Sequence, residues 1–197
     1  MKNLFLLVAI STFSTTSLFA QEIRFGTKGG LNLASVNVDG ESGGRTSFHI
    51  GSVVEFGITD EISIVSEVLF SGQGFKAEIP VQDNAGNTQN IEGTFKFNYI
   101  NLPIMGKYEI VEGLSSYLGP QVGFLLSADF EANDQEVDVK DSFKSIDFSG
   151  AFGLGYELDN GLNFSARYTV GLSDIFEDGN ADGKNNVLLV SVGYMFN

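Results

Sequence analysis

The chain has 197 residues, a formal net charge of −14 and no cysteine. The negative charge excludes the attraction to phosphates on which nucleic-acid binding depends, and the lack of cysteine excludes disulfides and thiol chemistry. The 24 glycines and 18 phenylalanines, with only 3 prolines, favour strands and turns over helices.

The first twenty residues have the pattern of a secretory signal peptide. Lys2 provides a basic start, residues 4–10 are apolar, and a Ser/Thr-rich stretch leads to Ala20. The apolar run is far shorter than the ~20 residues that a helix needs to cross a bilayer. We therefore predict that residues 1–20 are a signal peptide cleaved after Ala20, with Ser17 as the competing site, and that residues 21–197 form one domain.

Eight stretches of the mature chain alternate between bulky apolar residues and small or polar residues. This period of two is typical of β-strands, and no stretch has sustained helical spacing. The predicted strands are 24–36, 48–58, 62–70, 95–108, 114–126, 146–158, 162–172 and 187–196. The sequence therefore predicts an all-β domain.

The connections between these strands alternate strictly between short and long. The short ones are 59–61, 109–113 and 159–161, and the long ones are 37–47, 71–94, 127–145 and 173–186. Short periplasmic turns and long extracellular loops are typical of outer-membrane barrels. We therefore predict an eight-stranded antiparallel up-and-down transmembrane β-barrel with long extracellular loops and short periplasmic turns.

The composition of the two faces indicates which one meets lipid. Large residues such as Phe48, Phe164 and Val190 would overfill a narrow barrel, whereas the opposite parity is mainly Gly, Ser, Ala and Asn with isolated charges. We predict that the large residues face lipid; a soluble lipocalin-like ligand binder, with its apolar face inward, is the alternative. The fourth strand has bulky residues on both parities, which predicts a bulge or register change near Ile100 and Asn101.

Four segments resemble the PorT-like outer-membrane β-barrel family, which carries the outer membrane protein beta-barrel domain. They are FGTKGGLNLASV (25–36), FNYINLPIMGKYEI (97–110), SYLGPQVGFLLS (116–127) and the closing VSVGYMF. The resemblance spans the mature chain and implies an outer-membrane barrel in a Gram-negative-type cell. The member that gives the family its name is associated with secretion of surface proteins.

Several polar residues fall on the predicted lumenal face. Glu55, Glu67, Lys107, Glu157 and Arg167 could line a gated polar path, but an eight-stranded barrel leaves little room for water, so we expect ion pairs that fill the lumen.

His49 also falls on the lumenal face, and it is the only histidine of the chain. A Ser/His/Asp site for acyl transfer is conceivable, but the sequence places no nucleophile beside it. We expect a hydrogen-bonded lumenal histidine and no enzymatic activity.

The stretch from Asp178 to Lys184 resembles the start of a calcium loop. Asp178, Asn180 and Asp182 have the spacing of the first ligands, and Gly183 stands where such a loop turns sharply. The twelfth position, however, is Leu189 rather than a bidentate glutamate. A polar hairpin loop is therefore the favoured interpretation, with a weak calcium site as the alternative, and we predict no other metal site and no cofactor.

These patterns predict a structural or interaction protein of the outer membrane that displays acidic loops. Residues 127–144 hold six acidic side chains against Lys140 and Lys144, which suits cations or a basic partner. The expected partners are outer-membrane lipid and secreted or surface proteins, the expected state is a monomer, and a role in secretion or surface assembly follows from the resemblance. A small porin-like pore or a lipid-modifying enzyme is the alternative.

Overall fold

The computed structural model describes residues 22–37, 43–82, 88–133, 135–177 and 183–196. The predicted signal peptide and the three calcium-loop candidates Asp178, Asn180 and Asp182 lie outside these ranges. Among the residues that the structure describes, no helix is long and apolar enough to cross a membrane.

The described chain is almost entirely β-structure. Eight long strands are β1 (Ile23–Asn37), β2 (Gly43–Gly57), β3 (Ile62–Gln82), β4 (Thr88–Val111), β5 (Leu114–Ala132), β7 (Ile146–Glu157), β8 (Leu162–Gly171) and β9 (Lys184–Phe196). A short strand β6 (Gln135–Asp138) and one turn of 3-10 helix η2 (Lys140–Ser142) lie between β5 and β7.

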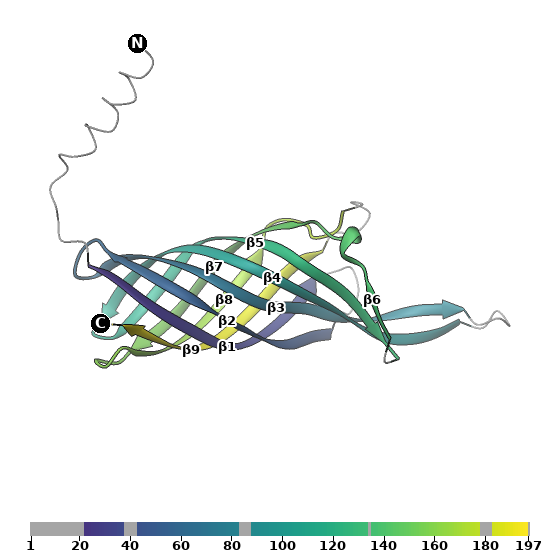
Figure 1. The fold of residues 1–197 in the computed structure, drawn as a ribbon, viewed down its shortest axis with the longest axis horizontal. Coiled ribbons are helices and arrows are strands. Elements are labelled where there is room, and N and C mark those ends of the chain that lie inside the picture. The colour runs from purple at the N-terminus through teal and green to yellow at the C-terminus, as the bar shows by residue number, and fades with distance from the viewer. Residues whose placement is uncertain (1–21, 38–42, 83–87, 134, 178–182, 197) are drawn as a thin grey trace, which may run out of the picture.

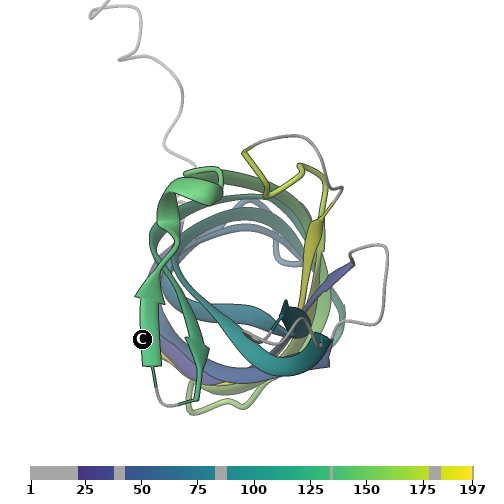
Figure 2. The same cartoon turned by 90° about the vertical axis from the view of Figure 1, so that its right-hand side faces the viewer.

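The eight long strands close into a barrel. Each pairs antiparallel with its neighbours along the chain, β4 pairs with β5, and β9 returns to β1 from Phe25↔Phe196 to Asn37↔Lys184. Viewed end-on, the strands form a continuous ring (Figure 2). Every strand edge of the ring therefore has a partner, which a bilayer requires because it offers no water to unpaired backbone groups. The predicted fold class is confirmed.

The two ends of the barrel differ sharply. The three short turns and both ends of the described chain lie at one end, where Gly113 (φ 79°) and Gly161 (φ 84°) adopt left-handed conformations that favour glycine. At the other end, the β3–β4 hairpin and the β5–β6 pair project well beyond the ring (Figure 1). Strands β3, β4 and β5 have 21, 24 and 19 residues, against the roughly 9–11 that cross a bilayer, so about half of each must stand outside it.

Side chains of the barrel wall follow the predicted parity. Phe48 (54% exposed), Phe164 (49%) and Val190 (52%) point outward, whereas Glu67 and Arg167 of the opposite parity are buried in the lumen. The outer surface is thus a band of large apolar side chains, as a lipid-facing wall requires.

A register change occurs close to the position predicted in the fourth strand, but the extra residue belongs to β5. β4 keeps one register with β3 throughout, and the irregularity lies in β5, where Asn98↔Ser127 is followed by Tyr99↔Leu125 and Leu126 is skipped. Both parities of β4 are bulky for another reason: Phe97 and Tyr99 point inward, into an aromatic cluster that fills the upper lumen.

Candidate functional site

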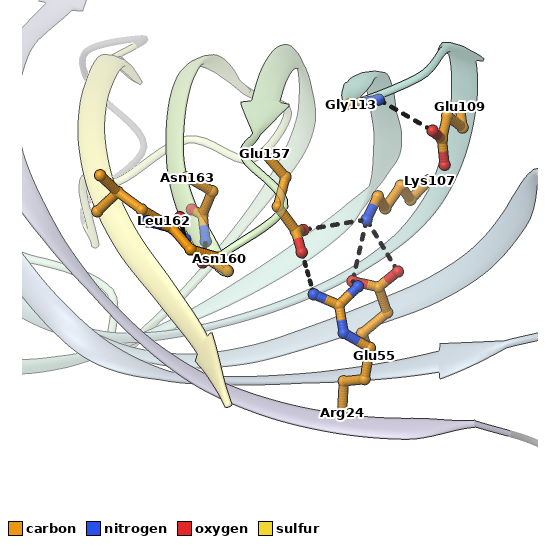
Figure 3. A network of polar contacts seen from close by, with 10 residues as sticks. Arg24, Glu55, Lys107, Glu109, Gly113, Glu157, Asn160, Leu162 and Asn163 are labelled. Carbon is orange, nitrogen blue, oxygen red and sulfur yellow. Dashed lines mark hydrogen bonds and ion pairs between the residues drawn. The ribbon is translucent and has the colours of Figure 1, made fainter. Parts of the chain in front are cut away.

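Four charged side chains join in a network at the short-turn end of the lumen, here called the mouth cluster (Figure 3). Lys107 Nζ lies 2.9 Å from Glu55 Oε1 and 3.7 Å from Glu157 Oε2. The Arg24 guanidinium also donates to Glu157, and it lies 3.9 Å from Glu55. Two cations and two carboxylates from four strands therefore neutralise one another across the barrel.

A second ionic group, the central cluster, lies deeper in the lumen. Arg167 donates to both carboxylate oxygens of Glu67, at 2.8 and 2.5 Å, and Lys28 Nζ lies 3.2 Å from Glu67 Oε1. All three residues are less than 10% exposed. Lys28 pairs in the ladder with Gly51 and Gly193, whose missing side chains leave room for the lysine.

The two clusters unite all five lumenal charges that the sequence predicted, and they add two that it missed. Arg24 and Lys28 both come from β1, on the same parity as the small residues of the lumenal face. Their parity in the sequence already indicated that both side chains face the lumen. Their ion-pair partners lie on other strands, however, and can be identified only when the strand pairing of the closed barrel is known. The expected interior ion pairs are present in the structure.

His49 is the centre of a buried hydrogen-bond chain. Its Nδ1 lies 2.7 Å from Asn32 Oδ1, and its Nε2 lies 2.8 Å from Ser191 Oγ. Gly30 stands between His49 and Ser191 in the ladder, so no side chain separates them. Sequence alone does not reveal the serine beside this histidine, because the contact depends on β1 pairing with both β2 and β9.

The Ser191–His49–Asn32 chain has the connectivity of a nucleophile, a base and an orienting group. The three residues are nevertheless at most 5% exposed. An acyl substrate must reach the serine oxygen and find hydrogen-bond donors for its developing negative charge. The burial of all three side chains denies that access.

Aromatic side chains close the upper lumen at the long-loop end. This cap comprises Phe75, Phe95, Phe97, Tyr99, Phe143 and Phe176, together with Val36, Leu125 and Ile175. Phe97 and Phe143 pack edge to face with their ring centroids 4.7 Å apart. Phe143 and Phe176 come from two different long connections and form an isolated β-bridge, so the loops themselves complete the closure.

Asp174 fixes the last long connection over the cap. Its Oδ1 accepts hydrogen bonds from the backbone N–H of Gly183 (2.9 Å) and of Phe176 (3.3 Å), and Lys144 Nζ lies 3.7 Å from its Oδ2. Partial burial works to raise the pKa of Asp174, but these hydrogen bonds and the lysine outweigh it, and the pKa lies below its ordinary value. The carboxylate is therefore charged at neutral pH.

Gly183 lies next to the calcium-loop candidates and packs closely against Phe176. It is not among the described residues with positive φ, and a Cβ at this position would stand 2.3 Å from a Phe176 ring carbon. The glycine therefore serves the close packing of Phe176. Among the described residues, no group of three or more His, Asp or Glu side chains could hold a metal ion.

A hollow of about 340 Å³ opens at the short-turn end, outside the mouth cluster. Glu22, Asp60, Glu61 and Glu109 line it, together with Arg24 and Lys107 of its inner wall. Its polar, mainly acidic lining contrasts with the lipid-facing wall. The ion pairs of the mouth cluster form its inner wall.

These features define a small transmembrane β-barrel whose lumen is filled by ion pairs, hydrogen bonds and an aromatic cap. The sequence matches the family model described as "Outer membrane protein beta-barrel domain" over residues 19–177. The chain belongs to this family, and it is an outer-membrane β-barrel protein. The short turns therefore face the periplasm and the long loops face outward. No protein with curated annotation matches the chain.

Several solved outer-membrane barrels are similar in fold. Ail, the attachment invasion locus protein of Yersinia pestis, has 16% identity and a TM-score of 0.53, covering 89% of this chain and 99% of Ail. Neisserial surface protein A has 13% identity and a TM-score of 0.57, covering 87% and 97%. OprG of Pseudomonas aeruginosa has 14% identity and a TM-score of 0.50, covering 89% and 97%. At these identities the likeness concerns the fold alone.

Proposed function

We propose that this protein is an interaction barrel, which anchors an acidic extracellular platform in the outer membrane and assists secretion or assembly of surface proteins. The observation that carries the proposal is the surplus length of β3, β4 and β5, which raises a sheet above a barrel whose interior is filled. A chain that needed only to cross the membrane has no use for this extension, whereas a docking platform does.

The charges of the extension support a basic partner. Lys96 Nζ is held 2.5 Å from Glu131 Oε2 and 3.3 Å from Glu136 Oε1, so this lysine is already neutralised. Asp138 and Asp141 remain exposed beside it, without an ion pair in the described part of the chain. The platform therefore presents an excess of carboxylates, which attracts cationic segments and repels anionic ones.

The contrast with a similar barrel sharpens this preference. Ail has been crystallised with the heparin analogue sucrose octasulfate, a polyanion. The acidic platform of the present chain favours the opposite sign of partner. We therefore propose lysine- and arginine-rich segments of exported proteins, rather than sulfated or phosphorylated polymers, as the partner class.

Photo-crosslinking from Val137 tests this function. Val137 is 56% exposed in β6, next to Asp138, so a photoreactive residue placed there in intact cells should capture exported proteins. Neutralising the site by Asp138→Asn/Asp141→Asn, or raising the salt to about 1 M, should strongly reduce capture because the attraction is electrostatic. The same probe at Thr59, in a periplasmic turn, is the matched control. Equal products from both positions, or products unchanged in the neutral variant, would contradict the proposal.

The proposed role in secretion and the proposed PorT-like affiliation are both supported by the sequence resemblance. Two of the segments that carry the resemblance are strands of the barrel: residues 25–36 lie in β1 and residues 97–110 lie in β4. We propose that residues 1–20 are removed as a signal peptide and that the mature chain acts as a monomer in outer-membrane lipid.

We propose that the Ser191–His49–Asn32 chain is structural and that the protein is not an enzyme. The support is burial: Ser191 is 5% exposed and His49 1%. A serine-directed fluorophosphonate probe should leave the folded protein unlabelled. Stoichiometric labelling at Ser191 that disappears in His49→Gln would contradict this and revive the lipid-modifying alternative.

A further inference from the structure

Asp147 is a buried carboxylate that has no cationic partner among the described residues. It is 7% exposed at the start of β7, facing the lumen below the aromatic cap. Its Oδ1 accepts a hydrogen bond from Ser173 Oγ at 2.7 Å, and the Asn185 side chain lies close to it. By contrast, the buried carboxylates of the central and mouth clusters each meet a lysine or an arginine.

Three further polar atoms in this part of the lumen lack a partner. They are Tyr99 Oη, Gln121 Oε1 and Asn185 Oδ1. Their residues are 1%, 5% and 3% exposed, so surface solvent cannot satisfy them. The Asn185 amide nitrogen donates to Gln73 Oε1, and the amide oxygen is the atom without a partner.

A glycine allows side chains of the two strands beside β5 to approach one another closely. Gly123 pairs with Asn101 on one side and with Asp147 on the other, so the rung between them has no side chain. A Cβ at Gly123 would stand 2.7 Å from Asn101 Oδ1, 3.3 Å from Tyr99 Cδ1 and 3.7 Å from Asp147 Cβ. Gln121 occupies the next rung on the same face of β5, opposite Ser149.

The chemistry of this set is that of a cation site. A buried carboxylate without a counter-charge and unpaired buried oxygens both carry a large desolvation cost. One carboxylate, amide oxygens and a phenolic oxygen are hard ligands, which suit Na⁺ or Ca²⁺ and not the softer metals bound by thiolate or imidazole. We propose that Asp147, Asn185, Gln121 and Tyr99, which lie around Gly123, bind one small hard cation beneath the cap. This inference does not depend on the proposed function.

Thermal unfolding in detergent tests the site, with circular dichroism as the readout. NaCl and CaCl₂ are titrated separately against choline chloride at constant ionic strength. A cation that binds only the folded state should raise the unfolding midpoint by about 3–6 °C for each tenfold increase above its dissociation constant. Asp147→Asn should abolish this dependence, whereas Asp141→Asn, an exposed carboxylate, should retain it.

A second variant guards against misfolding of Asp147→Asn. Gly123→Ala places a methyl group 2.7 Å from Asn101 Oδ1 and 3.3 Å from Tyr99 Cδ1, so side chains around the site must shift while every charge stays in place. It should therefore also abolish the dependence on the cation. Midpoints of the wild type that are equal in Na⁺, Ca²⁺ and choline would overturn the proposal and leave water as the occupant. A cation dependence that survives in both Asp147→Asn and Gly123→Ala would overturn it equally, because the cation would then bind elsewhere.

Discussion

Val190→Arg is expected to destabilise the folded barrel by about 2–4 kcal/mol, because it places a charge on the lipid-facing wall near the middle of β9. Val190 is 52% exposed on the outer face and pairs with Leu31 of β1 and Ala166 of β8. The guanidinium has no lumenal carboxylate within reach from this face, so its desolvation remains uncompensated. Equilibrium unfolding by urea in lipid vesicles measures the difference.

Val190→Leu is the matched control, since it keeps an apolar side chain in the same position. It should unfold at nearly the wild-type urea concentration. If Val190→Arg were as stable as Val190→Leu, the assignment of the two faces would be reversed, and the apolar parity would not contact lipid.

Glu67→Gln should lower the free energy of unfolding by still more, about 3–5 kcal/mol, because it leaves two buried cations without their carboxylate. Arg167 and Lys28 both bind Glu67 in the central cluster, and no other carboxylate of the described residues lies within ion-pair distance of either. Glutamine keeps the size of the side chain, so the loss reports charge rather than packing. The same urea titration provides the free energy of unfolding.

Two companion variants separate charge from fold. Replacing the whole cluster, as Glu67→Gln/Lys28→Met/Arg167→Met, should recover most of the lost stability because no buried charge remains. Glu131→Gln removes a partly exposed partner of Lys96 and should cost less than about 1 kcal/mol. A Glu67→Gln variant no less stable than Glu131→Gln would show that the central cluster is hydrated and open.

The wall of the barrel could be predicted from sequence because lipid imposes one simple rule. In β2, β7, β8 and β9, every outward position meets hydrocarbon and every inward position meets a narrow lumen, so the parity of bulky residues identifies the faces. The strict alternation of short and long connections fixed the topology in the same way. Both signals are local and survive without knowledge of which strands pair.

This rule fails where a strand contacts lipid on one side and apolar side chains of the lumen on the other. Phe97 and Tyr99 point inward like Glu55 and Glu67, but they meet the cap rather than the ionic clusters. Local alternation cannot distinguish that arrangement from a bulge, and the fourth strand was interpreted as one. The strands were also predicted too short, because β3 and β4 continue outside the membrane, where alternation is weaker.

The contacts within the lumen depend on closure and were therefore invisible. His49 meets Ser191 across Gly30, and Asp147 faces Asn101 across Gly123. In each case a glycine on the central strand allows side chains from two other strands to approach. The sequence shows the glycines and the polar residues separately, and only the register joins them.

Single-channel recording in planar bilayers tests most directly whether the barrel is a platform rather than a pore. The full mature chain is reconstituted, and flotation of matched vesicles confirms that the protein is in the bilayer. The mouth cluster, the central cluster and the aromatic cap lie one after another along the lumen. We therefore expect no stable unit current in about 1 M KCl. Reproducible unit conductance from the wild-type chain would contradict it and favour the small pore.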